Sequence, residues 1–225
     1  GSNTSVKERP VTIDVTCGGD EHTHTPSRPS QGTEEPATPV TPDIPAVPSV
    51  SFLDVAEGAW YYDAVVYMVS NGYMNGVSDA HFEPNGQLSR AMLATLFHRL
   101  SGGELAGSAN PFTDIPVDAW YARAVNWAAA NGILLGTSDT TFSPGQVATR
   151  EMVVTVLYRY AKAEPVAEDH LSAFMDAETV SGWARDAVNW AVAEGYLQGS
   201  AGMLNPRGVM TRAEMAQLLM NFLRK

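Results

Sequence analysis

The chain has 225 residues and a formal net charge of −11 at pH 7. This acidity argues against a nucleic-acid-binding protein, which needs a basic surface to neutralise phosphates, and against binding to an anionic membrane surface. No apolar run reaches the roughly 18 to 20 residues that a membrane-spanning helix requires, so no transmembrane segment is expected.

Residues 1–50 differ in composition from the rest of the chain. Eight of the 14 prolines fall in this segment, separated mainly by Thr, Ser, Glu and Gln. Such a composition buries too little apolar surface to offset its ordering entropy, and regular prolines favour an extended, semi-rigid linker. Within it, residues 11–16 alternate with a period of two, which predicts either a strand left over from a preceding domain or a small edge strand. The single cysteine, Cys17, cannot form an internal disulfide.

A set of landmarks is repeated three times after residue 50. The first copy contains Phe52-x-Asp54, Trp60, Gly72, Gly76, Phe82-x-Pro84 and Ser89-Arg90. The second copy follows 60 positions later with Phe112-x-Asp114, Trp120, Gly132, Gly136, Phe142-x-Pro144 and Thr149-Arg150. The third copy contains Phe174-x-Asp176, Trp183, Gly195, Gly199, Leu204-x-Pro206 and Thr211-Arg212. A period of this length predicts stacked or circularly packed units.

Each copy predicts two helices joined by a loop. The Trp opens a segment with apolar residues at helical spacing, as in Trp60, Ala64, Tyr67 and Met68. The first glycine of each copy lies where a left-handed C-cap would end that helix. The second helix begins at the Ser or Thr before the arginine, and its apolar face follows i, i+3, i+4, i+7. These faces are Leu93, Leu96, Phe97 and Leu100; Val153, Val156, Leu157 and Tyr160; and Met215, Leu218, Leu219 and Phe222.

One pair of short helices cannot enclose a hydrophobic core, whereas three pairs can. We therefore expect an all-α fold in which three helix–loop–helix repeats form one cooperative body. The repeats are predicted at residues 51–107, 108–168 and 169–225, after the Pro-rich linker.

The arginine at the start of each second helix is the strongest candidate for a binding residue. These arginines are Arg90, Arg150 and Arg212. A cation in the first turn opposes the helix dipole by about 0.3 to 1 kcal/mol, so the dipole does not explain it. One explanation is a structural ion pair with Asp54, Asp114 or Asp176. The other is an anion site, in which helix-end amides and the guanidinium converge on a carboxylate or phosphate, and the two explanations are compatible.

Two further sets of residues are candidates for ligand binding. They are the tryptophans Trp60, Trp120 and Trp183, and the glycines Gly76, Gly136 and Gly199. An indole can stack on the apolar face of a sugar, but at helical spacing a core position is the commoner role. Trp127 and Trp190 fit the buried stripe better. The glycines either adopt positive φ in a turn or allow close approach of a ligand.

The sequence offers no metal site and no cofactor or catalytic motif. His22 and His24 lack Cys or His partners at finger spacing, and Asp79 and Asp139 lack the carboxylate spacing of a calcium loop. No nucleophile elbow, P-loop or dinucleotide fingerprint is present. A glycosidase needs one asymmetric carboxylate pair, which threefold repetition does not supply, so an enzyme is disfavoured.

These landmarks resemble the S-layer homology domain family, from about residue 50 to the end of the chain. The family pattern includes the F-x-D start, paired glycines, F-x-P and a T-R-A-E signature. Thr211 to Glu214 match this signature in full, the second copy has its acid shifted to Glu151, and the first copy has none. The resemblance implies a pseudo-threefold, three-pronged bundle with grooves between neighbouring repeats.

The resemblance also implies a non-covalent anchoring module at the bacterial cell surface. Its usual ligand is a secondary cell-wall polysaccharide that ends in pyruvylated N-acetylmannosamine. In the family, the motif arginine pairs with the pyruvate carboxylate while the Asp and Trp hold the sugar. These roles are implied here for Arg90, Arg150, Arg212, Asp54, Asp114, Asp176, Trp60, Trp120 and Trp183. The alternatives are a surface-layer subunit that self-associates and a module that tethers the envelope to peptidoglycan.

Overall fold

The structure is a computed structural model that describes residues 51–103 and 110–225. The expected linker at residues 1–50, the strand at residues 11–16 and Cys17 lie outside the described residues. In the described part, six α-helices and three short 3-10 helices are joined by loops, and strand pairing is limited to isolated bridges. This confirms the all-α fold class.

The elements follow in chain order. They are α1 (Tyr62–Ser70), α2 (Arg90–Leu100), α3 (Ala122–Ala130), α4 (Arg150–Tyr160), η1 (Leu171–Ala173), η2 (Ala177–Thr179), η3 (Gly182–Ala184), α5 (Arg185–Ala193) and α6 (Arg212–Leu223). None of these helices is both long and apolar enough to cross a membrane, in the part of the chain that the structure describes.

The first helix of each repeat ends at the predicted glycine. At the end of α1, Gly72 has φ +72° and donates to the Val69 carbonyl at 2.9 Å, and Tyr73 donates to Met68 at 2.9 Å. These two bonds form a Schellman motif, which satisfies carbonyls that the helix itself leaves unpaired. Gly132 and Gly195 also have positive φ, so the predicted C-caps are confirmed in all three copies.

The start of the first helix differs from the prediction. The helices begin two residues after the Trp, and the three indoles are 63%, 66% and 57% exposed in chain order. A turn precedes each helix, closed in the first repeat by the bond from the Tyr62 amide to the Ala59 carbonyl. The indole is therefore outside the helical period and does not join the buried stripe. Trp127 and Trp190 are buried, as expected.

The second helices begin and pack as predicted. The side-chain oxygens of Ser89, Thr149 and Thr211 accept the backbone amides of the third helical residue, and Thr211 with Glu214 forms a full capping box. In each helix the first three residues of the predicted apolar face are buried, and the fourth packs against the core.

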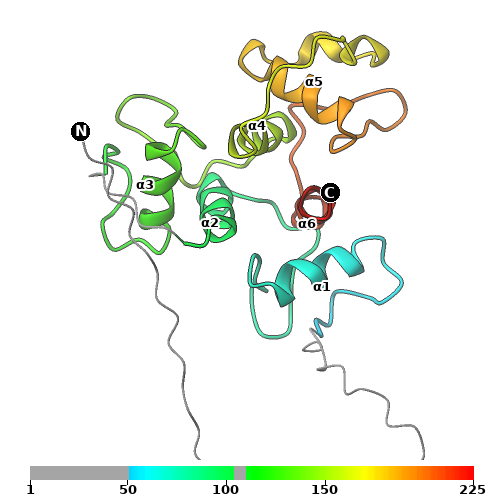
Figure 1. Cartoon of the computed structure of the whole chain (residues 1–225). Helices are drawn as coiled ribbons and strands as arrows, with labels where there is room; N and C mark the ends of the chain where they lie inside the picture. Colours follow the sequence, from blue (N-terminus) through cyan, green and yellow to red (C-terminus); the bar gives the residue numbers. More distant parts are fainter. Residues whose placement is uncertain (1–50, 104–109) are drawn as a thin grey trace, which may run out of the picture. The chain divides into compact units, whose positions relative to one another are not determined.

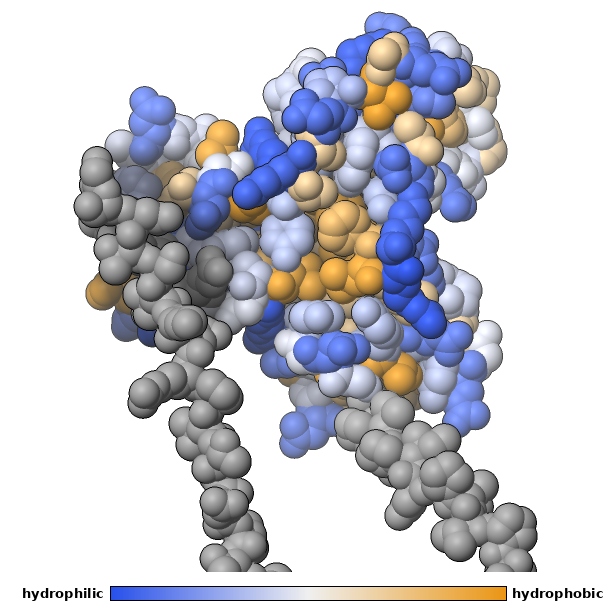
Figure 2. Space-filling model, in the orientation of Figure 1, coloured by the Kyte–Doolittle hydropathy of each residue, from blue (hydrophilic) through white to orange (hydrophobic). Residues whose placement is uncertain are grey.

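Helices from different repeats pair in a cyclic order. α2 packs on α3, α4 packs on α5, and α6 packs on α1, so each second helix holds the first helix of the next repeat (Figure 1). Side chains link the second helices to one another, with ring centroids 5.2 Å apart for Phe97 and Tyr160 and 6.4 Å apart for Tyr160 and Phe222. One hydrophobic core contains residues of all three repeats. In Figure 2, apolar residues gather near the middle of the visible face, with hydrophilic residues around them.

Candidate binding grooves

Each motif arginine reaches from its own repeat into the loop of the next one. Arg212 donates from Nε to the Phe82 carbonyl at 2.8 Å and from Nη2 to the Asn75 carbonyl at 2.7 Å. Arg90 donates in the same way to Phe142 at 2.8 Å and to Leu135 at 2.5 Å. Arg150 donates to Leu204 and Gln198, both at 3.1 Å. The three guanidiniums therefore connect the repeats in a closed ring.

The aspartates hold the same loops from the opposite side. The Asp54 carboxylate accepts the backbone amides of Phe82 at 2.9 Å and Glu83 at 2.7 Å. Glu83 has φ +57° immediately before Pro84, a conformation that a non-glycine residue rarely adopts. Arg212 binds the carbonyl of Phe82 while Asp54 binds its amide, so the two side chains clamp one strained segment. The other repeats place Asp114 and Asp176 in the same way.

The expected Arg–Asp ion pair does not form among the described residues, but the charges act on each other at longer range. Burial alone would raise the pKa of Asp54, yet the hydrogen bonds from Phe82 and Glu83 outweigh it and the pKa is lowered. Burial lowers the pKa of Arg90 to about 10, with partial compensation from Asp114. Burial also lowers the pKa of Arg212.

The helix-end amides are not available for an anion, contrary to the sequence expectation. The amides of Arg90 and Ala91 donate to the carbonyls of Gln146 at 2.9 Å and Pro144 at 3.0 Å, in the next repeat. The next amide is occupied by the Ser89 side chain. The other two repeats repeat this pattern, so ligand recognition falls to the side chains.

Three grooves lie beside these arginines, and all three repeats contribute to each groove. Groove A, of about 350 Å³, is lined by the 73–77 loop, α2, Trp120 and Arg212. Groove B, of about 410 Å³, is lined by the 134–137 loop, α4, Trp183 and Arg90. Groove C, of about 320 Å³, is lined by the 195–198 loop, α6, Trp60 and Arg150. The structure thus brings each predicted Arg together with one predicted Trp, while the aspartates stay outside the groove linings.

The indoles present exposed faces to these grooves. Trp60 and Trp120 are supported by edge contacts with Tyr61 and Tyr121, at centroid distances of 5.2 and 5.1 Å. The segment before Trp183 is held instead by Glu151, which accepts the backbone amide and hydroxyl of Ser181 at 2.9 and 2.8 Å. An exposed, fixed indole beside a guanidinium suits a ligand with an apolar face and a nearby negative charge, as an acidic sugar has.

The second glycines are required by packing. Gly76 lacks positive φ, and a Cβ there would lie 2.5 Å from the Phe52 ring and 2.8 Å from the His81 carbonyl. Gly136 and Gly199 face Phe112 and Phe174 in the same way. The phenylalanine that begins each copy therefore leaves no room for a side chain at the second glycine. The alternative considered from the sequence, that these glycines adopt positive φ in a turn, is wrong. Gly76 and Gly136 also line grooves A and B.

The sequence reasoning missed a second arginine in two of the grooves. Arg99 lines groove A and Arg159 lines groove B, whereas the equivalent position in groove C is Asn221. Each of these residues lies nine positions after the arginine that begins its own helix, so alignment of the copies could have found them. Burial lowers the pKa of Arg159.

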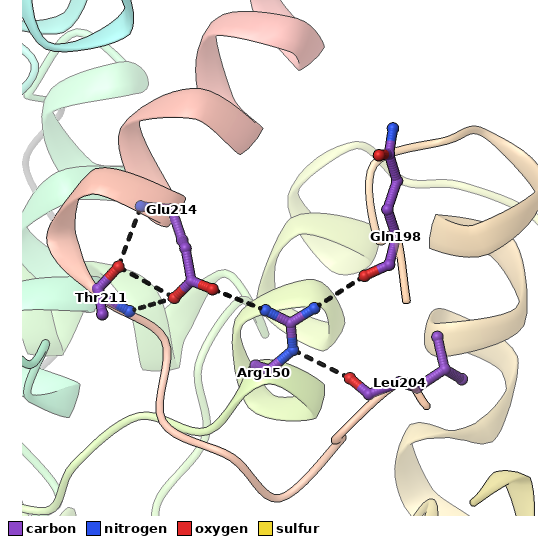
Figure 3. Close-up of polar contacts among 5 residues, drawn as sticks. All are labelled: Arg150, Gln198, Leu204, Thr211 and Glu214. Atoms are coloured by element: carbon purple, nitrogen blue, oxygen red, sulfur yellow. Dashed lines mark hydrogen bonds and ion pairs between the residues drawn. The ribbon is translucent and has the colours of Figure 1, made fainter. Parts of the chain in front are cut away.

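Groove C also contains an ion pair that was not expected (Figure 3). Arg150 Nη1 lies 3.1 Å from Glu214 Oε1. The other oxygen of Glu214 accepts the Thr211 amide at 2.8 Å and its hydroxyl at 3.0 Å, so the capping box fixes this carboxylate. Among the described residues, no group of three or more His, Cys, Asp or Glu side chains could hold a metal ion in any groove.

The three copies match a known protein family. The model of the S-layer homology domain family matches residues 51–92, 111–151 and 173–216. The chain is 36% identical over 158 residues to the Surface-layer 125 kDa protein of Lysinibacillus sphaericus, covering 68% of this chain and 13% of that protein. It is 27% identical over 178 residues to an Amylopullulanase of Thermoanaerobacterium thermosulfurigenes, covering 78% and 10%.

A third relative is the Cellulosome-anchoring protein of Acetivibrio thermocellus, 27% identical over 153 residues, which cover 65% of this chain and 34% of that protein. This chain therefore spans only a small part of the relatives it matches. Surface-layer proteins among the relatives confirm the expected location at the bacterial cell surface. The matched segments cover more than half of the described residues, and the chain belongs to the S-layer homology domain family.

Proposed function

We propose that this chain is a non-covalent, non-catalytic anchoring module that binds an acidic cell-wall polysaccharide in grooves A, B and C. The observation that carries the proposal is the pairing of a guanidinium with an exposed indole in each groove. The names of its relatives, a surface-layer protein and a cellulosome-anchoring protein, support anchoring at the envelope. The activity named for the amylopullulanase is not carried over, because the match covers 10% of that protein.

The ligand group that best fits the guanidinium is a carboxylate, such as that of pyruvylated N-acetylmannosamine. In groove A, Nη1 of Arg212 has no hydrogen-bond partner among the described residues, so it can donate to a ligand. A charge-assisted hydrogen bond contributes about 1.5 to 3 kcal/mol, so one groove binds modestly. Several grooves on one polymer add about 10² to 10⁴-fold in avidity.

We propose one role for each of the other three sets of predicted site residues. The aspartates position the loops, because backbone amides already occupy both oxygens of each carboxylate. The second glycines shape the same loops. The tryptophans stack on the sugar.

We also propose the finer architecture that the family resemblance implies. The repeats at residues 51–107, 108–168 and 169–225 would form a pseudo-threefold, three-pronged bundle. The cyclic order of the helix pairs supports this arrangement. Residues 1–50 would serve as an extended linker.

Binding to purified wall polysaccharide, with and without its pyruvate groups, tests the proposal. We expect removal of pyruvate to weaken binding at least tenfold. We expect the same from the triple variant Trp60→Ala, Trp120→Ala, Trp183→Ala, whose sites are all more than half exposed. Val117→Ala, at a 94% exposed site outside the groove linings, is the control for loss of surface apolar area.

Equal binding to both polysaccharides would contradict the carboxylate assignment, and full binding by the triple variant would contradict the grooves. Arrays that form without polysaccharide, measured by light scattering, would favour the self-associating subunit. Binding to peptidoglycan stripped of its attached polysaccharide would favour the tethering module.

A further inference from the structure

We infer that grooves A and B are the anion sites of this chain and that groove C takes an uncharged sugar. The inference rests on the proposed function for the identity of its ligand. Its basis is a difference in charge between grooves that share one backbone plan.

The difference lies in the third residue of each second helix, two residues after the arginine that begins that helix. This position holds Met92 in groove A, Met152 in groove B and Glu214 in groove C. In groove B, Nη1 of Arg90 meets only the Met152 Sδ, at 3.6 Å, and a thioether is a weak, uncharged acceptor. In groove C, the same atom of Arg150 is paired with the Glu214 carboxylate at 3.1 Å. The groove C guanidinium is therefore neutralised from within the chain.

The motif arginines of grooves A and B are buried without such a partner. Arg90 is 4% exposed and Arg212 is 7% exposed, yet no acidic residue lines either groove among the described residues. Burying a cation without a paired anion is costly, so a bound carboxylate would relieve that cost. Nη1 of Arg212 has no partner in the described part of the chain and is available for that carboxylate.

A second guanidinium strengthens the contrast. Groove A adds Arg99 and groove B adds Arg159, whereas groove C has Asn221 at this position. Grooves A and B therefore each carry two cations and no acid, and groove C carries one cation and one acid. Gln217 and Asn221 line groove C beside Trp60, and Gln217 Nε2 donates to Asn221 Oδ1 at 2.9 Å. Their remaining amide groups suit the hydroxyl and amide groups of a neutral N-acetylhexosamine. One chain would thus hold both the charged and the uncharged residues of its polymer.

The number of sites is measured by native mass spectrometry and calorimetry with the methyl glycoside of pyruvylated N-acetylmannosamine. We expect two bound molecules per chain, and three for Glu214→Gln. Gln at this position preserves the capping box, so the variant removes charge without removing the cap. Glu178→Gln, at an exposed site outside the grooves, removes the same charge and should leave two. Three sites in the wild type, or two in Glu214→Gln, would overturn the inference.

The three tryptophans provide a matched set. Trp120→Ala and Trp183→Ala should each remove one anionic site. Trp60→Ala should leave both anionic sites and abolish binding of the pyruvate-free methyl glycoside to groove C. Equal losses of the anionic probe from all three variants would overturn the inference while leaving the proposed function intact.

A second measurement does not depend on the saccharide. Sodium pyruvate is titrated while the arginine Nε–H signals are followed by NMR. We expect the signals of Arg90 and Arg212 to shift and that of Arg150 to stay, until Glu214→Gln makes it respond as well. Equal shifts at all three arginines, or none at any, would overturn the charge assignment. If the saccharide does not bind but pyruvate shifts the signals of Arg90 and Arg212 as expected, the result would count against the proposed function only.

Discussion

Grooves A and C have the same frame but different charges, because the described residues that line groove A include two arginines and no acid, whereas those of groove C include one arginine and one glutamate. In both, a motif arginine binds two carbonyls of the next loop and a capped helix forms one wall. This frame uses only backbone groups of the arginine's partners, so it does not restrict the third residue of the helix that forms the groove wall. That position is free to be Met92 in groove A and Glu214 in groove C. The charge of a groove can therefore change without altering the contacts that hold the repeats in a ring.

The largest expected effect is on the shared frame. Arg90→Ala and Arg212→Ala should each lower the free energy of unfolding by about 3 to 5 kcal/mol, because two loop carbonyls lose charged donors. Urea denaturation measures this change. Arg123→Ala, on the exposed side of α3, should change stability by less than about 0.5 kcal/mol. If Arg90→Ala is no more damaging than this control, the arginines do not hold the ring.

The second prediction gives groove B the acid that groove C has beside its motif arginine. Met152→Glu should place a carboxylate beside Arg90 and weaken binding of the anionic probe there about tenfold or more, which corresponds to about 1.4 kcal/mol. The melting temperature should stay the same or rise, since the introduced carboxylate would complete a capping box with Thr149. Met152→Gln completes the box without the charge and should keep its affinity. Undiminished binding by the Met152→Glu variant would show that this position does not set groove charge.

The third prediction concerns high pH, where the affinity of groove B for an anion should fall and the affinity of groove C for a neutral sugar should not. Burial lowers the pKa of Arg90 to about 10, and only the protonated guanidinium attracts a carboxylate. Anion affinity in groove B should therefore fall as pH rises through about 10, by up to tenfold per pH unit above it. Calorimetry between pH 8 and 10.5 measures this fall. Binding of the neutral glycoside in groove C at the same pH controls for unfolding, and a flat anion profile would contradict the shifted pKa.

The smallest effect is at low pH and concerns the loops of two repeats. The pKa values of Asp54 and Asp114 are lowered, against the effect of burial, by the backbone amides they accept. Their contribution to stability is full above the ordinary value of 3.8 and is lost as pH falls through the lower folded-state values. Asp114→Asn should reduce the fall in melting temperature between pH 4 and 2, whereas Asp79→Asn, at an exposed turn, should not. Identical profiles for both would contradict the clamp.

Much of the local structure could be predicted from sequence. Gly72 ends a helix because positive φ is nearly free for glycine, and Thr211 begins one because its hydroxyl accepts an orphan amide. Both effects act within a few residues, so the sequence contains them in full. The placement of Trp60 on the apolar face of the first helix was wrong, because a turn that periodicity does not reveal separates it from the helix and leaves it exposed.

The repeat alone determined that three equivalent arginines begin three helices and that no single repeat can enclose a core. Only the tertiary structure decided where those arginines point, because Arg90 bonds to a carbonyl 52 residues away and Arg212 to one 130 residues away. The same closure puts Trp120 beside Arg212 and Glu214 beside Arg150. Glu214 has a sufficient local role as a cap, so its second role in neutralising a groove depends on contacts that form only when the ring is complete.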